Sequence, residues 1–240
     1  SKDEAMLSAQ ETSRNLIRSM AHEIKNPLGG IRGAAQLLGR EFGDSDLSEY
    51  TRIIIDETDR LRDLVDRMLG PRIPSERKPV NVHDILEHVA AVIDAEAGHM
   101  VKIVRDYDPS IPDLIGDRGQ LIQALLNISR NALQALLESN TPDPQITLST
   151  RIQRRFTIGR QHHPLIARVQ IRDNGPGIPE ELISNIFFPM ITGRAEGTGL
   201  GLAITQNLIS QHGGLVECQS TPGQTEFILY LPLDIHYAEA

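Results

Sequence analysis

A histidine followed directly by a carboxylate stands in a segment with helical spacing, and this pair could carry nucleophilic chemistry. His22 precedes Glu23, and Asn26 lies one turn further on. The helical repeat places His22 about 200° around the axis from the apolar residues two positions away, so its imidazole projects toward solvent. Pro27 removes a backbone hydrogen bond and predicts a kink. An exposed imidazole beside a carboxylate can be a nucleophile that a base activates; an ordinary surface histidine is the alternative.

A second group consists of three amides in one row of a predicted helix. Asn127 and Asn131 are four residues apart, and Gln134 follows three residues later, so all three share a face. Amide oxygens can coordinate Mg²⁺ and hydrogen-bond phosphates without a large local charge. Helix interiors disfavour asparagine, so two in register need a reason. The row is either a binding face or a solvent-facing polar side.

The sequence DNGPG, which begins at Asp173, follows a predicted strand. A carboxylate that leaves a strand into a glycine turn can accept a hydrogen bond from an amino group such as that of adenine. Gly175 and Gly177 would let a base lie close to the backbone. A tight turn without a ligand is the alternative.

The sequence GTGLGL at 197–202 opens another predicted helix. Glycines before a helix N-terminus expose N–H groups that bind phosphate, and the helix dipole adds to this attraction. The sequence is neither GxGxxG nor a P-loop and no lysine follows, which excludes Rossmann and P-loop sites. The preceding segment, 187–196, has no periodicity and predicts a mobile lid. A plain glycine loop and a structural loop are the alternatives.

Two amphipathic helices must position His22. Apolar residues recur every three or four positions over 16–38 and again over 50–68, with Gly43 between them. A hairpin with one apolar face is too thin to form a core alone. We therefore expect residues 1–70 to pair with a second copy in an all-α four-helix bundle, which makes the protein a homodimer.

A proline-punctuated linker at 71–79 leads to a second domain at 80–240. Strands mixed with long helices predict an α/β sandwich for this domain. The predicted elements are a helix at 82–95, a strand at 101–107, a helix at 119–137, strands at 145–155 and 165–172, a helix at 200–212 and a final strand pair around Pro222 and Gly223.

Composition excludes several classes of protein. The 240 residues include 24 Lys and Arg against 32 Asp and Glu, and a net charge of −8 gives no general attraction to nucleic acid. The single cysteine, Cys218, excludes internal disulfides and suits a reducing compartment. We therefore expect a cytoplasmic location. No stretch approaches the ~20 apolar residues of a membrane span. Because the chain begins inside a helical pattern, we expect it to be part of a longer protein.

Taken together and in this order, the motifs resemble the GHKL ATPase fold that histidine kinases share with heat-shock chaperones, DNA gyrase and mismatch-repair ATPases. The upstream sequence HEIKNP on a helical hairpin is similar to that of sensor histidine kinases of two-component systems. The sequences NISRNALQA, DNGPGIP, FPMITGR and GTGLGLAI resemble those of the nitrogen-regulation kinases in particular.

The resemblance implies roles for the histidine region. His22 would be the phosphoacceptor, Glu23 the base that assists it, and Asn26 the residue that positions water when the partner regulator is dephosphorylated. The partner would be the receiver domain of a response regulator of the NtrC type. The input signal would arrive through the PII signal protein.

The resemblance also implies a site for ATP and Mg²⁺. Asn127 and Asn131 would bind Mg²⁺ and the triphosphate, while Asp173 would accept the adenine amino group and Thr225 would contact the nucleotide. The implied nucleotide-binding residues are Asn127, Arg130, Asn131, Gln134, Asp173, Gly175, Gly177, Ile178, Arg194, Gly197, Thr198, Gly199, Leu200, Gly201, Leu202 and Thr225.

Two departures from the usual kinase pattern concern positive charge near the phosphates. The lid reads MITGR at 190–194 where kinases commonly carry FFTTK, so Arg194 replaces a lysine. Many relatives have Lys or Arg at the position of Gln134, and Arg130 could supply that charge instead. Two other functions remain open from sequence: an ATPase of this fold that acts by conformational change, and a scaffold with a degenerate nucleotide site.

Overall fold

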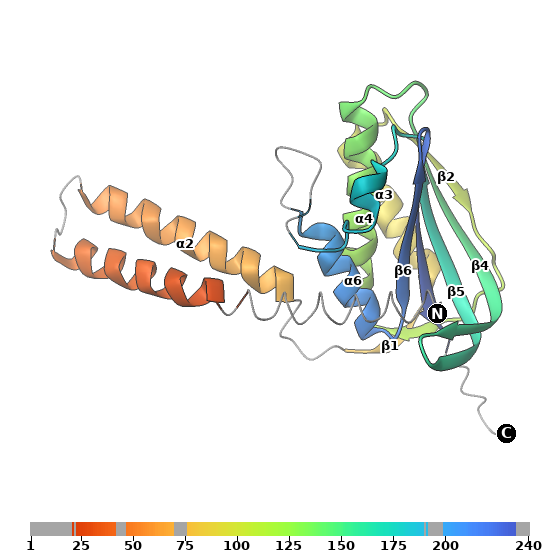
Figure 1. Ribbon diagram of the computed structural model, residues 1–240, viewed down its shortest axis with the longest axis horizontal. Helices are drawn as coiled ribbons and strands as arrows, with labels where there is room; N and C mark the ends of the chain where they lie inside the picture. The colour runs from red at the N-terminus through yellow and green to blue at the C-terminus, as the bar shows by residue number, and fades with distance from the viewer. Residues whose placement is uncertain are drawn as a thin grey trace. The chain divides into compact units, whose positions relative to one another are not determined.

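The computed structural model of the protein divides at Pro74–Ser75 into two compact units, which are described separately (Figure 1). The residues that the structure describes are 21, 23–41, 47–69, 76–189, 191 and 199–233.

The first unit is a pair of helices with a heptad seam between them. Residues 23–41 are helical, and α2 spans Leu47–Leu69. A spacing of seven keeps side chains in line on helices that pack side by side. The seam residues are buried: Ala21, Leu28 and Ala35 on the first helix, and Thr51, Thr58 and Val65 on α2.

Two contacts fix how these helices approach each other. A Cβ atom on Gly39 would lie 3.2 Å from Thr51 Oγ1, so this glycine marks a close approach between the helices. Arg32 Nε donates to Asp59 Oδ1 at 2.7 Å. Both side chains are partly exposed, so the pair specifies alignment more than it stabilises the unit.

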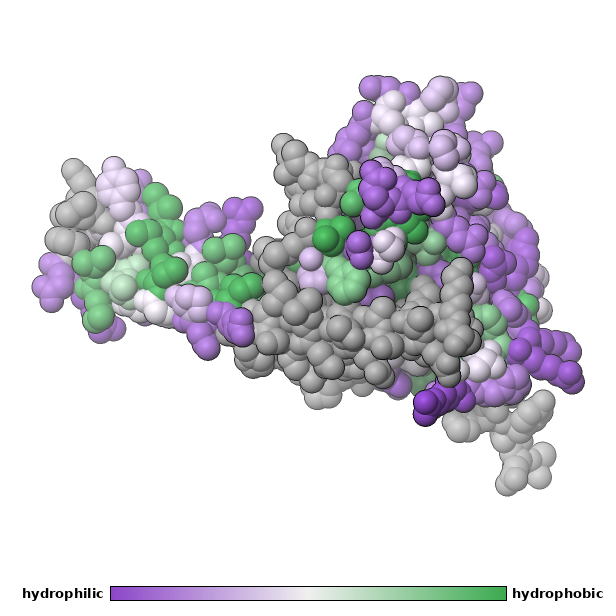
Figure 2. Space-filling model, in the orientation of Figure 1, coloured by the Kyte–Doolittle hydropathy of each residue, from purple (hydrophilic) through white to green (hydrophobic). Residues whose placement is uncertain are grey.

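A second apolar stripe on this unit faces solvent. Ile31 and Leu38 are 49% and 47% exposed, and Ile54 and Leu61 on α2 are 42% and 47% exposed. Figure 2 shows apolar side chains on the visible surface of this unit. The sequence pattern combined both stripes into one apolar face, whereas the structure separates an inner seam from an outer one. Several exposed apolar side chains aligned on one face are typical of an interaction surface.

The second unit is a five-stranded sheet covered on one face by helices, which confirms the predicted α/β sandwich (Figure 1). The strands, in spatial order, are β2 (Lys102–Asp106), β4 (Gln145–Ile158), β5 (Gln161–Asp173), β7 (Gln224–Pro232) and β6 (Leu215–Thr221). The helices are α3 (Val82–Ala97), α4 (Arg118–Glu138) and α6 (Gly201–Gln211).

The alternation of β5 explains which face of the sheet the helices cover. Ala167, Val169 and Ile171 are almost completely buried, as are Leu121 and Ile128 on α4. Successive strand side chains point to opposite faces, so the intervening residues of β5 belong to the outer face. The core therefore lies between this side of the sheet and the helices.

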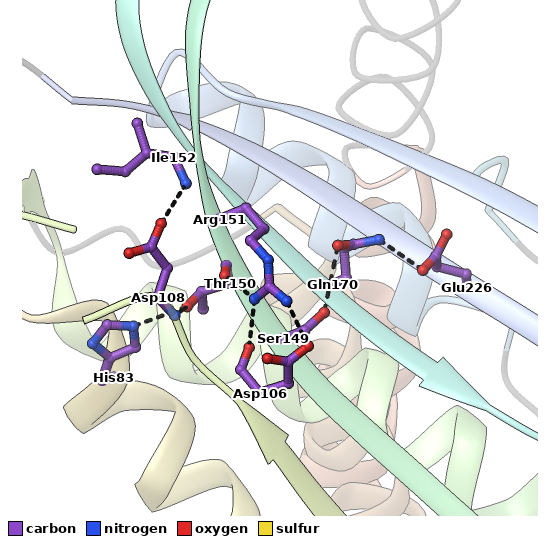
Figure 3. A network of polar contacts seen from close by, with 9 residues as sticks. All are labelled: His83, Asp106, Asp108, Ser149, Thr150, Arg151, Ile152, Gln170 and Glu226. Atoms are coloured by element: carbon purple, nitrogen blue, oxygen red, sulfur yellow. Dashed lines mark hydrogen bonds and ion pairs between the residues drawn. The ribbon is translucent and has the colours of Figure 1, made fainter. Parts of the chain in front are cut away.

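The outer face of the sheet carries hydrogen-bonded polar side chains (Figure 3). Gln170 on β5 donates to Glu226 on β7 at 2.7 Å. Arg151 on β4 pairs with Asp106 at the end of β2, with 2.6 Å between Nη2 and Oδ2. These contacts join neighbouring strands on the face of the sheet opposite α3, α4 and α6.

Several short elements were missing from the sequence prediction. β1 (Lys78–Val80) pairs antiparallel with β3 (Leu114–Gly116), so part of the predicted linker forms a strand. Strands β4 and β5 continue to a tight turn at Gly159 and beyond the predicted ends. A single-turn helix, α5 (Glu180–Ile183), follows the DNGPG turn. Three- and four-residue elements are too short to show a hydrophobic period.

Within the described part of the chain, no helix combines the length and apolar character that a bilayer crossing needs.

Candidate functional site

A pocket with a volume of about 670 Å³ lies between α4, the start of α6 and the β5 and β7 ends of the sheet. This volume is within the range of about 300–1,000 Å³ that is typical of small-molecule sites. Of the residues predicted from sequence, the pocket is lined by Asn127, Arg130, Asn131, Gln134, Asp173, Gly177, Ile178, Gly199, Gly201, Leu202 and Thr225.

Asp173 is the buried carboxylate of this pocket. It is the last residue of β5 and is 5% exposed. Gly175 N–H donates to Asp173 Oδ1 at 2.9 Å, which fixes the orientation of the carboxylate. A Cβ atom on Gly175 would lie 2.8 Å from the same oxygen, so the turn requires glycine here. The turn therefore holds Asp173 in one orientation at the pocket wall.

The second glycine of this turn permits a close backbone approach. Gly177 has φ +91°, and a Cβ atom there would lie 2.7 Å from the carbonyl oxygen of Thr221. The turn thus packs directly on the β6–β7 hairpin. Thr225 on β7 is the register partner of Asp173 and is also buried, so the two side chains share one face of the sheet.

The amide row of α4 lies against the start of α6. Asn127 Nδ2 donates to the carbonyl oxygen of Gly201 at 3.0 Å. Thr205 Oγ1 donates to the same oxygen at 2.9 Å and lies 3.3 Å from the carbonyl oxygen of Ala124. These bonds fasten α6 to α4, so the helix N-terminus and the amide row face a common space. This arrangement suits an anion with a bound cation.

Arg130 lines the pocket but is already paired. Its Nε lies 3.1 Å from each carboxylate oxygen of Glu96, and its Nη2 lies 2.6 Å from Oε1. The hydrogen bond from Arg130 lowers the pKa of Glu96, and Glu96 in turn raises the pKa of Arg130. The positive charge of Arg130 is therefore already paired with the carboxylate of Glu96. A phosphate group that binds Arg130 would have to compete with this ion pair.

Not every residue predicted from sequence lies at the pocket. Gly175 acts through its hydrogen bond to Asp173, and Leu200 is the buried N-cap residue of α6. Glu23 and Asn26 are exposed in the helical unit. The predicted positions that fall outside the described residues are His22, Arg194, Gly197 and Thr198.

The structure adds lining residues that sequence reasoning missed. Ala135, Leu182, Ile186 and Phe227 supply apolar walls, and Glu138 adds a carboxylate at the end of α4. Apolar surface of this kind suits a planar base. In the sequence these residues have the ordinary spacing of core positions, so nothing distinguished them from structural residues.

His212 links the two helices of the site at their far ends. Its Nδ1–H donates to the carbonyl oxygen of Leu208 at 2.8 Å, and its Nε2 accepts from Asp117 N–H at 3.0 Å. Asp117 is the N-cap of α4, so one neutral imidazole joins the start of α4 to the end of α6. Burial lowers the pKa of His212, which keeps the imidazole neutral in the folded state.

A pH-dependent loss of stability is expected from this arrangement. Because the pKa of His212 is lower in the folded than in the unfolded state, its contribution is complete above about pH 6.5. It is lost as the pH falls from there through the folded-state pKa. Replacing His212 by Leu leaves Asp117 N–H without its acceptor and should cost about 1 to 3 kcal/mol at pH 7.5.

Chemical unfolding of both proteins at pH 7.5 and pH 5.5 measures this effect. Between pH 7.5 and pH 5.5 the variant should lose less stability than the wild type. The carboxylates contribute equally to the loss in both proteins, so the difference comes from protonation of His212. Equal losses would contradict a neutral His212 as the link.

Two family models match the chain. "Histidine kinase-, DNA gyrase B-, and HSP90-like ATPase" matches residues 116–235, which contain the pocket, and "His Kinase A (phospho-acceptor) domain" matches residues 12–70. The chain therefore belongs to the histidine kinase-, DNA gyrase B- and HSP90-like ATPase family, and the phosphoacceptor domain places it among the sensor histidine kinases.

Within this class, the chain is similar to the sensory histidine kinase/phosphatase NtrB. It is 48% identical over 233 residues to NtrB from Escherichia coli O157:H7, covering 97% of this chain and 66% of that protein. It is 41% identical to NtrB from Rhizobium meliloti (strain 1021), covering 93% of this chain and 59% of that protein. The chain thus spans about two thirds or less of the length of these relatives.

Solved structures agree with the fold. Full-length ShkA in complex with AMPPNP is 25% identical, with a TM-score of 0.58 over 91% of this chain and 45% of that one. The nucleotide-free catalytic domain of histidine kinase ThkA is 26% identical, with a TM-score of 0.54 over 65% of this chain and 95% of that one.

Proposed function

We propose that this protein is an ATP-dependent protein-histidine kinase that transfers the γ-phosphoryl group of ATP to His22. The observation that carries the proposal is the pocket, which brings a buried carboxylate, an amide row and a helix N-terminus together in one unit. The match of residues 12–70 to the phosphoacceptor domain supports a histidine of the same chain as the group that receives the phosphate.

The pocket has chemically distinct ends that fit the two parts of ATP. Asp173 accepts the adenine amino group, with Gly177 and Ile178 against the base. The triphosphate lies toward Asn127, Asn131 and the start of α6. Asn127 and Asn131 would hold Mg²⁺, which neutralises phosphate charge when bound. Phosphate oxygens and water would supply the remaining ligands, since Mg²⁺ in such sites usually keeps several waters.

The chain's own contribution to phosphoryl transfer is positioning and proton transfer. Transfer requires the γ-phosphoryl group of bound ATP to lie in line with the attacking nitrogen of the His22 imidazole. Glu23, which follows His22 in the sequence and is exposed, accepts the imidazole proton as the new P–N bond forms. The product is phosphohistidine and ADP.

The phosphoryl group then passes to an aspartate on the receiver domain of an NtrC-type response regulator. We further propose that the protein dephosphorylates the same regulator, that the PII signal protein controls the balance, and that both activities take place in the cytoplasm. The relative named "Sensory histidine kinase/phosphatase NtrB", which matches 97% of this chain, supports the dephosphorylation part of this proposal.

Incubation with labelled ATP and a purified NtrC-type receiver domain tests the proposal. We expect acid-labile label on His22 first and on the regulator afterwards. ATP hydrolysis without any label on the chain would instead indicate an ATPase that acts by conformational change. An absence of both nucleotide binding and turnover would indicate a scaffold.

The two activities should separate in variants of Glu23 and Asn26. Asn26 carries a donor and an acceptor and can orient water near a docked aspartyl phosphate. Replacing Asn26 by Ala should strongly reduce dephosphorylation of the regulator and leave part of the kinase activity. Glu23→Gln should show the opposite bias, because an amide cannot accept the proton. The assay compares decay of phospho-regulator with label uptake from ATP; equal losses in both variants would count against separate roles.

We also propose that the outer apolar stripe of the helical unit is the surface of a homodimer. Two such stripes facing each other complete a four-helix bundle with an apolar core. Ile31 and Leu61 would be central in this core, because each is about half exposed in the single chain.

A charge in this stripe should separate the dimer. Ile31→Asp would bury an unpaired carboxylate, which is costly without a partner. Light scattering at micromolar concentration should show a dimer for the wild type and a monomer for the variant. Leu37→Asp is the matched control, since Leu37 is 63% exposed and lies about 120° around the helix from Ile31. A wild-type monomer, or dissociation by the control alone, would contradict this interface.

A further inference from the structure

A hydroxyl group that lines the pocket is hydrogen-bonded to a second hydroxyl group on the neighbouring strand. Ser220 on β6 and Thr225 on β7 are register partners, and their Oγ and Oγ1 atoms lie 2.9 Å apart. Thr225 is 5% exposed, lines the pocket and is the register partner of Asp173. Ser220 is half-buried, lies beside Thr225 on the neighbouring strand and is not among the residues that line the pocket.

Ser220 has a second partner in the glycine turn. Ile178 N–H donates to Ser220 Oγ at 2.8 Å. Ile178 lines the pocket, and the preceding Gly177 packs against the Thr221 carbonyl. Ser220 therefore connects the turn that carries Asp173 to the strand that carries Thr225.

The hydrogen-bond capacity of Ser220 allows two directions for its proton. A hydroxyl has one hydrogen and two acceptor lone pairs, and one lone pair is used by Ile178 N–H. The hydrogen can go to Thr225 Oγ1 at 2.9 Å or to the carbonyl oxygen of Gln224 at 3.4 Å. The 2.9 Å contact to Thr225 can form in either direction. When a ligand accepts the Thr225 hydrogen, the Ser220 hydrogen can turn to Thr225 Oγ1, and Ser220 is then the donor of the pair.

This choice has a consequence for the pocket. A Thr225 hydroxyl that accepts from Ser220 keeps its own hydrogen and can donate it to a ligand. In the opposite arrangement Thr225 would donate to Ser220 and offer the ligand only an acceptor. Adenine presents an amino donor and, next to it, the N1 acceptor. Asp173 matches the amino group, and a donor from Thr225 matches N1, either directly or through one water.

We infer that Ser220 is a positioning residue for purine selection, which holds the Thr225 hydroxyl as a hydrogen-bond donor toward adenine N1. The inference rests on the proposed ATP site and adds to it a residue that lies outside the pocket. It predicts that removing the Ser220 hydroxyl weakens recognition of N1 while the triphosphate contacts remain.

Equilibrium binding of ATP and 1-deaza-ATP to the 240-residue chain tests the inference. The analogue lacks the N1 acceptor, so the wild type should bind it about tenfold more weakly than ATP. Ser220→Ala should bind ATP about tenfold more weakly and should lose most of the difference between the two ligands. Ser220→Thr keeps the hydroxyl and should restore the difference.

Two further variants separate positioning from folding. Ser220→Cys keeps the side-chain size and weakens its hydrogen bonds, so it should behave like Ser220→Ala. Ser149→Ala makes the same deletion on the outer face of the sheet, where Ser149 Oγ lies 3.4 Å from Gln170 Oε1, and should leave binding unchanged.

An undiminished penalty for 1-deaza-ATP in the Ala and Cys variants would overturn the inference. So would a wild type that binds both ligands equally. A wild type that binds neither would instead contradict the proposed ATP site. The two failures are therefore distinguishable.

Discussion

Replacing His22 by Gln should abolish incorporation of phosphate from ATP while ATP still binds. Glutamine has no nucleophilic nitrogen of comparable basicity, so the covalent step has no acceptor. ATP affinity should remain within about twofold of wild type, because the substitution and the pocket belong to different compact units. The measurement pairs acid-labile label retention with equilibrium binding of ATP.

A histidine elsewhere in the same family-matched region would be the alternative acceptor, but residues 12–70 contain His22 as their only histidine. His88→Gln in the second unit is the matched control and should leave labelling unchanged. Persistent label in the His22 variant would contradict its assignment as phosphoacceptor.

Asp173→Asn should have the converse effect and reduce ATP affinity. Gly175 N–H binds Oδ1 of the native carboxylate at 2.9 Å, so the oxygen of an introduced amide would stay at that position. The amide NH₂ would then face the adenine amino group, placing two donors together. Loss of this bond should cost about 1 to 3 kcal/mol, or roughly ten- to a hundredfold in affinity.

The control for this substitution is Asp106→Asn. Asp106 pairs with Arg151 on the outer face of the sheet, and the same chemical change there should leave ATP binding unaltered. Calorimetric titration with ATP compares the two variants. Normal affinity in Asp173→Asn would remove this carboxylate from the proposed adenine site.

The local parts of the pocket could be predicted from sequence because each depends on nearby residues. Asn127 and Asn131 share a helix face through their spacing alone. Gly177 has φ +91° and Gly199 has φ +64°, conformations that other residues seldom adopt. Glycines in the sequence could therefore indicate the turns at these positions. Helical and strand periods likewise predicted the α/β sandwich before any tertiary contact was known.

In the helical hairpin, the spacing of apolar residues could not predict which of them are buried. The apolar positions between residues 16 and 38 form one stripe in sequence, yet Leu28 and Ala35 are buried while Ile31 and Leu38 remain about half exposed. Both sets have a spacing of seven residues. Only the packing of α2 against the first helix determines which set becomes the inner seam and which remains available for a second copy.

Contacts between residues that are far apart in the sequence could be seen only in the tertiary structure. The partners Arg130 and Glu96, and likewise Asp117 and His212, are far apart in sequence, and no spacing rule joins them. The register that sets Asp173 beside Thr225, and Thr225 beside Ser220, arises from the pairing of three strands. Sequence periodicity specifies which face a side chain occupies, whereas its neighbour across the sheet depends on strand order and alignment. For this reason the motifs could be recognised in the sequence, whereas the hydrogen-bonded pair of Ser220 and Thr225 could not.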